Sequence, residues 1–209
     1  MAKIGLIDYG MGNLFSVQQA FKRINQPLDI VSNINTLKFC DALILPGVGS
    51  FDPAMTNLKR TDLIPSIIDW VNNGRPLLGI CLGLQLLFES SEEGSLKGLG
   101  VIKGKIRKLP NEKNERIPHI GWSPLCKTNE CPILENYPDS NWMYFVHSYF
   151  ACPSEQKHTV ATTKFGKTDF SSIVWHKNTC ACQFHPEKSG VAGQKLILNW
   201  INWLKKTKF

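Results

Sequence analysis

The sequence has no hydrophobic run long enough to cross a membrane. Its apolar segments stop well short of the roughly 20 residues that a transmembrane helix needs. Residues 1–8 enter an apolar, strand-like run directly, without the basic region, apolar core and cleavage site of a secretory signal. Repeats, linkers and low-complexity segments are also lacking. We therefore expect a cytoplasmic protein that folds as one domain over residues 1–209 and has no membrane partner.

The cysteines lack the pattern of a disulfide framework. There are seven, an odd number, and their spacing is irregular. No two of them form a C-x-x-C pair, which argues against a structural zinc site. This usage is typical of a reducing cytoplasm. Nothing else in the sequence requires a metal, a nucleotide or a flavin, so we expect no metal and no other cofactor.

The charge is unbalanced, with a formal net value of +7 at pH 7. Much of the excess lies in two stretches, residues 97–116 and 205–208. Basic and aromatic residues do not alternate there, as they do in grooves that stack nucleotide bases. We interpret both stretches as solvated faces and expect no nucleic-acid partner. The stretch 97–116 either faces an acidic partner surface or is simply hydrated.

The first 90 residues alternate short buried strands with helices. Continuous apolar runs predict strands at residues 3–8, 28–31, 42–45 and 76–80. Helical periodicity or composition predicts helices near residues 14–24, 53–59 and 62–73. This alternation predicts an α/β fold with a doubly wound, mostly parallel sheet, whose functional residues lie at the carboxyl ends of the strands.

The pattern changes after residue 94. Short strand-like runs, separated by glycines and polar turns, predict antiparallel hairpins attached to the same sheet, at residues 101–106, 117–122, 142–146, 158–163, 172–175 and 180–184. Residues 191–204 carry an apolar helical face and predict a closing helix.

One cysteine stands in a pattern that predicts a nucleophile. Residues 79–83 read Gly-Ile-Cys-Leu-Gly, between a short buried run and an apolar helical one. This is the G-x-nucleophile-x-G elbow with Cys81 in place of serine. Glycines are needed because strand and helix meet there in a strained turn. A helix N-terminus also favours the thiolate form. The alternative is a structural cysteine buried beside packing glycines.

A cysteine nucleophile needs a base and a third group that orients the base. His185 is the best candidate among the five histidines, because it directly follows the predicted strand 180–184. Pro186 stops that strand. Glu187 lies two residues after His185, so both side chains can leave the strand end on the same side. A His-Pro-Glu sequence alone is a weak signal, but together with the cysteine elbow it predicts a Cys-His-Glu triad.

Three motifs in this order resemble the class I (triad) glutamine amidotransferases: residues 46–49, 79–83 and 185–187. Four further segments, residues 8–13, 117–122, 144–149 and 183–190, are similar to the glutaminase subunits of imidazole glycerol phosphate synthases. The resemblance extends over about residues 3–204. It implies that the chain hydrolyses glutamine to glutamate and passes ammonia through a channel to a separate (β/α)8-barrel synthase subunit. That subunit makes imidazole glycerol phosphate and aminoimidazole carboxamide ribotide in histidine biosynthesis.

The resemblance also implies roles for individual residues. The catalytic residues are Cys81, His185 and Glu187. The backbone of the oxyanion hole comes from Val48, Gly49 and Leu82. The glutamine-binding residues are Gly47, Gln85, His147 and Ser148. The interface with the barrel subunit includes Trp122, Tyr144 and Lys188. His119 either lines the same cleft or is structural, and we expect His158 and His176 at the surface.

Three other interpretations remain open from the sequence. A paralogous glutaminase that feeds ammonia to another synthase, such as one acting on a nucleotide sugar, would have the same triad. A cysteine hydrolase, or a redox or chaperone-like α/β protein, can share the elbow, although His185 and Glu187 argue against it. A non-catalytic binding module would not need the complete triad.

Overall fold

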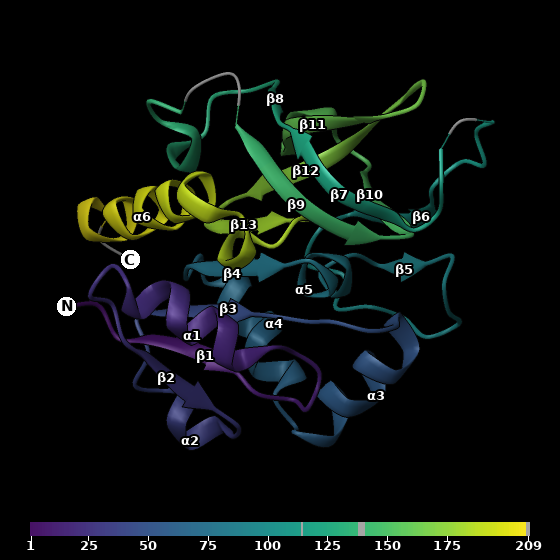
Figure 1. The fold of residues 1–209 in the computed structure, drawn as a ribbon. Helices are drawn as coiled ribbons and strands as arrows, with labels where there is room; N and C mark the ends of the chain where they lie inside the picture. The colour runs from purple at the N-terminus through teal and green to yellow at the C-terminus, as the bar shows by residue number, and fades with distance from the viewer. Residues whose placement is uncertain (114, 138–140, 208–209) are drawn as a thin grey trace.

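The computed structural model describes residues 1–113, 115–137 and 141–207. Residues 114 and 208, which belong to the two basic stretches, lie outside the described residues. A mixed sheet with the strand order β2-β1-β3-β4-β13-β12-β10-β6-β5 crosses the molecule, and helices cover it (Figure 1). None of the helices in these described ranges combines the length and the apolar character that a membrane crossing requires.

The N-terminal part of the sheet is parallel, as the alternation predicts. Its strands are β1 (Ile4–Ile7), β2 (Leu28–Val31), β3 (Ala42–Leu45) and β4 (Leu77–Ile80). The helices between and after them are α1 (Leu14–Lys22), α2 (Ile34–Leu37), α3 (Phe51–Arg60), α4 (Ile64–Asn72) and α5 (Leu82–Leu86). Three of these strands, β1, β3 and β4, are fully buried, which explains their unbroken apolar runs.

The C-terminal part extends the sheet with mostly antiparallel strands. β13 (Thr179–Cys182) lies parallel to β4 and antiparallel to the next strand in the sheet. The remaining strands of this part are β12 (Thr168–His176), β10 (Tyr149–Pro153), β6 (Gly104–Lys108), β5 (Ser90–Ser91), β11 (Thr159–Phe165) and β8 (Cys126–Lys127). Short 3₁₀ helices and the closing helix are η1 (Pro132–Leu134), η2 (Gln156–His158), η3 (Pro186–Lys188) and α6 (Gly190–Lys206).

Two of the predicted hairpin strands do not join this sheet. Among the described residues, β7 (His119–Pro124) and β9 (Trp142–His147) pair only with each other, antiparallel, as a separate ribbon. The prediction that every later strand attaches to the main sheet is therefore wrong for this pair. Along β9 the burial alternates, with Met143, Phe145 and His147 turned inward. One apolar face covers the core, which explains why the ribbon resembles a sheet strand in sequence.

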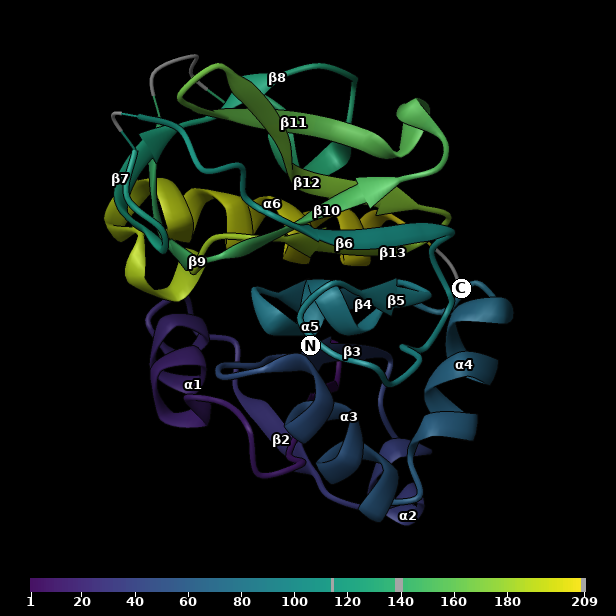
Figure 2. The same ribbon diagram turned by 90° about the vertical axis from the view of Figure 1, so that its right-hand side faces the viewer.

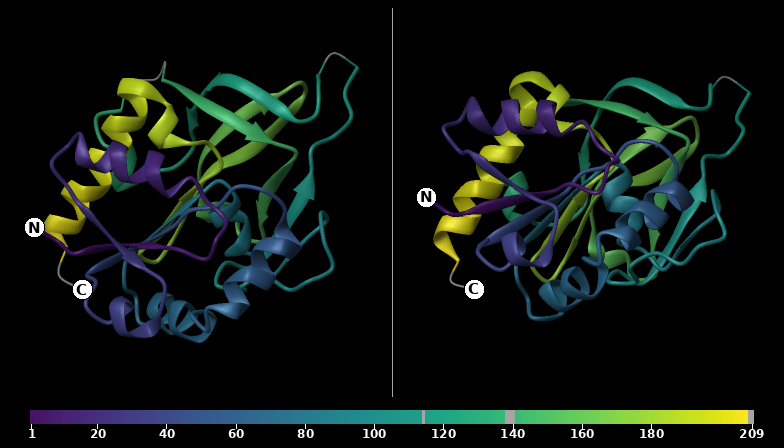
Figure 3. Two further views of the ribbon diagram at one scale, coloured as in Figure 1. Left: turned by 60° about the horizontal axis from the view of Figure 1, so that its bottom comes forward. Right: turned by 90° about the horizontal axis from the view of Figure 1, so that it is seen from below.

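Two apolar clusters lie on opposite faces of the sheet. Alternate residues of each central strand belong to different clusters, as with Leu77 and Leu78 of β4. Helices α1 and α6 cover one face, where Phe21 and Trp200 meet edge to face at 6.3 Å. Helices α3, α4 and α5 cover the other face (Figures 2 and 3). Because both faces of the sheet are covered, functional side chains can reach a substrate only at the strand ends and in the loops.

Candidate active site

Cys81 lies in a strained turn between β4 and α5. Its backbone has φ 54° and ψ −109°, a conformation that residues other than glycine rarely adopt. A Cβ at Gly83 would overlap the carbonyl oxygen of Leu45, and one at Gly79 would lie 2.9 Å from the Cβ of Ala181. Both glycines of the elbow are thus required by close packing. The turn holds the Cys81 side chain at the carboxyl end of the parallel strands.

His185 and Glu187 form a buried pair beside this turn. The Nδ1–H group of His185 donates to the Glu187 carboxylate over 2.7 Å, and their side chains are only 3% and 2% exposed. Burial alone would lower the His185 pKa. Hydrogen bonds with Cys81 and Glu187, together with the negative charges of these two groups, outweigh burial and raise that pKa to about 10. The imidazole of His185 therefore favours its protonated form.

A cavity of about 230 Å³ opens over these groups. Its wall consists of Val48, Gly49, Cys81, Gln85, Glu93, Pro118, Val146, His147, Ser148, Tyr149 and His185. Seven of these residues are predicted site residues, brought together from β3, β4, α5, β9 and β13 or the loops that follow them. A glutamine side chain entering this cavity would meet sulfur, imidazole and main-chain amides at one end.

Two predicted residues lie beneath the cavity rather than on its wall. Gly47 and Leu82 are buried, and a Cβ at Gly47 would lie 2.9 Å from the Leu82 Cβ. Gly47 therefore acts by allowing close approach of the 46–49 loop to the elbow. Gly49 has φ +104°, which a residue with a side chain rarely adopts.

The predicted interface residues lie around the loop that carries His185 and Glu187, which we call the triad loop. Trp122 is 49% exposed and packs edge to face on Tyr144, with ring centroids 5.9 Å apart. Lys188 is exposed. The backbone N–H of His185 donates to the Tyr144 carbonyl, and the Tyr144 N–H donates to Ser189 Oγ, each over 3.0 Å. The β7–β9 ribbon is thus bonded directly to the loop that carries His185 and Glu187.

His119 and His147 form a hydrogen-bonded chain behind the cavity. His147 Nδ1 must donate to the Tyr149 carbonyl, which can only accept. His147 Nε2 then accepts from His119 Nδ1 over 3.1 Å, and His119 Nε2 accepts from Ser123 Oγ over 3.0 Å. Burial lowers the His147 pKa to about 3, more than the Tyr149 bond raises it. His119 therefore supports the pocket from behind instead of lining it.

The prediction that His158 and His176 are surface residues is wrong. His158 is 7% exposed and His176 is half-buried. Their rings lie at 75° to each other, with His176 Nδ1 3.0 Å from His158 Nε2. The pair forms where the end of β12 meets η2, a contact that sequence spacing does not reveal.

Glu93 is a pocket residue that the sequence reasoning missed. Its side chain lines the cavity, and one carboxylate oxygen accepts from the Phe51 N–H over 2.9 Å. The predicted glutamine-binding residues include no anion, although free glutamine carries an ammonium group. A carboxylate is a natural partner for that group, but nothing in the run Ser91-Glu92-Glu93 indicates which glutamate faces inward. Pro118, Val146 and Tyr149 of the wall were missed as well.

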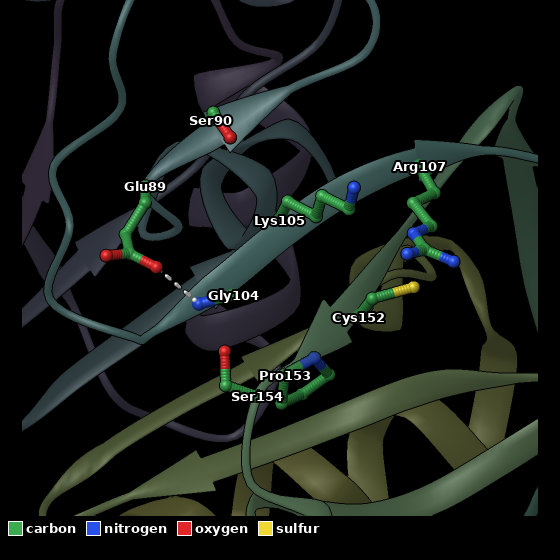
Figure 4. A pocket seen from close by; sticks show the side chains of 8 residues that line it. All are labelled: Glu89, Ser90, Gly104, Lys105, Arg107, Cys152, Pro153 and Ser154. Atoms are coloured by element: carbon green, nitrogen blue, oxygen red, sulfur yellow. Dashed lines mark hydrogen bonds between the residues drawn. The ribbon is translucent and has the colours of Figure 1, made fainter.

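A larger depression of about 480 Å³ lies elsewhere, between β6, β10 and β5 (Figure 4). Lys105, Arg107 and Cys152 line it, and the Glu89 carboxylate accepts from the Gly104 N–H there over 2.8 Å. Burial raises the pKa of the Cys152 thiol, which disfavours a thiolate nucleophile. We therefore assign the chemistry to the smaller cavity over Cys81. No metal-binding cluster of three or more His, Cys, Asp or Glu side chains occurs within the ranges described.

Comparison with known proteins agrees with this fold. A family model described as "Glutamine amidotransferase class-I" matches residues 5–203. Among solved structures, PurLQS from Thermotoga maritima superposes with a TM-score of 0.75 at 18% identity, covering 98% of this chain and 100% of that one. A structure titled glutamine amidotransferase gives a TM-score of 0.73 at 18% identity, covering 98% and 99%. The chain belongs to the class-I glutamine amidotransferases, and the predicted fold class is confirmed.

Curated relatives narrow the assignment. "Imidazole glycerol phosphate synthase subunit HisH" of Prochlorococcus marinus (strain NATL2A) is 82% identical over 209 residues, 100% of both chains. The protein of the same name from Synechococcus sp. (strain CC9605) is 50% identical over 202 residues, covering 97% of this chain and 95% of the relative. Within its class, the chain belongs to the family of these HisH subunits, as the sequence motifs predict.

Proposed function

We propose that this chain is the cytoplasmic glutaminase subunit of an imidazole glycerol phosphate synthase. It hydrolyses glutamine and delivers ammonia through a channel to a separate (β/α)8-barrel subunit, with which it forms a heterodimer. The single observation that carries the chemistry is the buried His185–Glu187 pair beside Cys81 on its strained elbow. The name of the 82% identical relative supports the pathway and the existence of a partner subunit.

The triad would act in two half-reactions. Cys81 Sγ bonds to the side-chain carbonyl carbon of glutamine, and the carbonyl electron pair moves onto the oxygen. As the C–N bond breaks, His185 Nε2–H gives its proton to the departing ammonia, leaving a glutamyl thioester. Water then attacks the thioester while His185 takes up its proton, and glutamate leaves as the thiolate reforms. Glu187 holds the imidazole and stabilises its charged form.

The rest of the cavity would hold the substrate. Glu93 pairs with the ammonium group of glutamine, and Gln85, His147 and Ser148 contact the amino and carboxylate groups. Backbone N–H groups of Leu82 and of Val48 or Gly49 stabilise the tetrahedral oxyanion. Losing one such donor typically costs about 3–4 kcal/mol. Gly49 gives the 46–49 loop freedom to rotate. We therefore propose that the backbone N–H of Val48 or Gly49 points at the oxyanion only in the assembled synthase.

Glutamate release by the purified chain tests this function. It is measured for the chain alone, then with a barrel synthase subunit and its ribulose-phosphate substrate, and with Cys81→Ala as the control. We expect low activity alone, an increase by orders of magnitude in the full mixture, and none with Cys81→Ala. Activity that requires Cys81 but ignores the barrel subunit would contradict the partnership. Equal rates of Cys81 acylation with and without the partner would contradict the proposed loop rotation.

A further inference from the structure

Gln183 has no role in the predicted triad or pocket, but its side chain reaches Cys81. Cys182 of β13 is aligned with Ile80 of β4, so the residues that follow them, Gln183 and Cys81, lie side by side. The Gln183 side chain is 0% exposed, and its Nε2 lies 3.8 Å from Cys81 Sγ. We propose that Gln183 is a further catalytic residue, which donates a hydrogen bond to the Cys81 thiolate and fixes the orientation of the Gln85 amide.

The neighbouring hydrogen bonds determine which end of the Gln183 amide faces the sulfur. Gln85 Nε2 lies 3.1 Å from the Tyr149 carbonyl oxygen, which only accepts, so this atom of Gln85 must be the NH₂ group. The same NH₂ group lies 3.3 Å from the other end of the Gln183 amide, which must therefore be the accepting Oε1. The Gln183 NH₂ group is then left to face Cys81. Reversing the Gln183 amide would set two NH₂ groups against each other.

A buried N–H donor matters most while the sulfur is charged. Hydrogen bonds to an ionised acceptor are roughly twice as strong as neutral ones. The bond is therefore stronger while the sulfur is charged and weaker once the sulfur is part of a neutral thioester. His185 already supplies a positive charge near the sulfur, whereas Gln183 supplies direction, since β12 holds its backbone through a 2.9 Å bond from the Gln183 N–H to the Ser172 carbonyl.

The second consequence concerns the substrate. Both protons of the Gln85 NH₂ group are engaged, by Tyr149 and Gln183. No residue in the described ranges donates to Gln85 Oε1, and Gln85 lines the cavity. Together with the Tyr149 carbonyl, Gln183 thus makes Gln85 present an acceptor, which suits the ammonium group of glutamine. This part of the inference rests on the proposed glutaminase function.

The test uses two variants of Gln183 that lose different hydrogen-bonding groups. Gln183→Met keeps the length of the side chain but has neither donor nor acceptor. Gln183→Glu keeps an oxygen for Gln85 and brings negative charge towards the sulfur. The first measurement is the pH dependence of iodoacetamide alkylation at Cys81, followed by mass spectrometry of its peptide. The second is the KM for glutamine in the complex with the barrel subunit and its substrate.

We expect the pH midpoint of Cys81 alkylation to rise by about one unit in Gln183→Met, as for the loss of a hydrogen bond of about 1.4 kcal/mol. The shift should be at least as large in Gln183→Glu. The KM should rise by about tenfold in Gln183→Met and clearly less in Gln183→Glu, which still accepts from Gln85. Exposed Cys126 serves as an internal control whose alkylation stays unchanged.

Gln26→Met is the matched control. Gln26 is also buried, at 3% exposure, and its Nε2 donates to the Ala2 and Pro27 carbonyls outside the cavity. This variant should lose stability but keep the wild-type midpoint and KM. If Cys81 in folded Gln183→Met or Gln183→Glu were alkylated with the wild-type pH midpoint, the donor role of Gln183 would be overturned. If the two variants had the same KM for glutamine, the role of Gln183 in orienting Gln85 would be overturned. Alkylation needs no turnover, so a wild type without glutaminase activity would refute the proposed function separately.

Discussion

At the scale of single residues, two buried histidines of one pocket have pKa values shifted in opposite directions. Burial dominates at His147, which bonds to a carbonyl and to neutral His119, and the pKa falls to about 3. At His185, burial is outweighed by Cys81 and Glu187, and the pKa rises to about 10. The same residue type is therefore a neutral support at one position and the proposed proton donor at the other.

The lowered pKa of His147 predicts a loss of stability in acid. Between pH 6.5 and about 3, the unfolded chain binds a proton at His147 that the folded chain does not. The free energy of unfolding therefore decreases as the pH is lowered through this range. The slope is up to about 1.4 kcal/mol per pH unit. His147→Gln keeps a donor for Tyr149 but does not titrate, so urea unfolding at several pH values should give it a shallower slope. Equal slopes would contradict the assignment.

At the scale of elements, the β4–α5 elbow depends on a glycine that a methyl group would disrupt. In Gly83→Ala, the added Cβ would overlap the Leu45 carbonyl of the neighbouring strand. We expect a loss of at least about 3 kcal/mol of stability, the upper end of ordinary overpacking costs, measured by urea unfolding. Gly12→Ala is the control, because its Cβ would find its nearest atom 3.4 Å away in Pro46. Similar midpoints for both variants would contradict this packing argument.

The elements that could be predicted are those whose signal is local. The bounds of β2 and β3 agree to the residue, and the elbow and α6 are found within two residues or so, because continuous burial or a helical face marks each one. β10 was not predicted, since it follows β9 after a single residue and ends at Pro153. The separate β7–β9 ribbon could not be told from a sheet strand, because both show one buried and one open face.

The site shows the same limit. Cys81, His185 and Gln85 could be predicted because motifs carry them, and all line one cavity. Glu93 and Gln183 could not, since their roles depend on the loop packed on α3 and on the register between β13 and β4. What the sequence does not express is which distant side chains a shared register brings into contact.

At the scale of the whole molecule, the β7–β9 ribbon joins the proposed partner surface to the triad. Its outer side carries Trp122 of the proposed interface, which is 49% exposed. Ile120 and Trp142, which are 61% and 53% exposed, also lie on the ribbon but outside the predicted interface residues. Its inner side bonds to the triad loop through Tyr144. A partner that presses on the ribbon would therefore act on the backbone that positions His185. This arrangement would explain the dependence of activity on assembly that we propose.

Trp122 should be an anchor of that assembly. Buried aromatic anchors contribute about 2 kcal/mol or more to binding, so Trp122→Ala should weaken association with the separately purified barrel subunit by roughly 30-fold, measured by calorimetry. Trp142→Ala is the matched control, since Trp142 lies on the same ribbon with similar exposure but outside the proposed interface. Both variants should keep the wild-type alkylation of Cys81, because neither side chain reaches the cavity. Equal weakening by the two substitutions would mean that the partner covers the whole ribbon, and no weakening by Trp122→Ala would move the interface to another face.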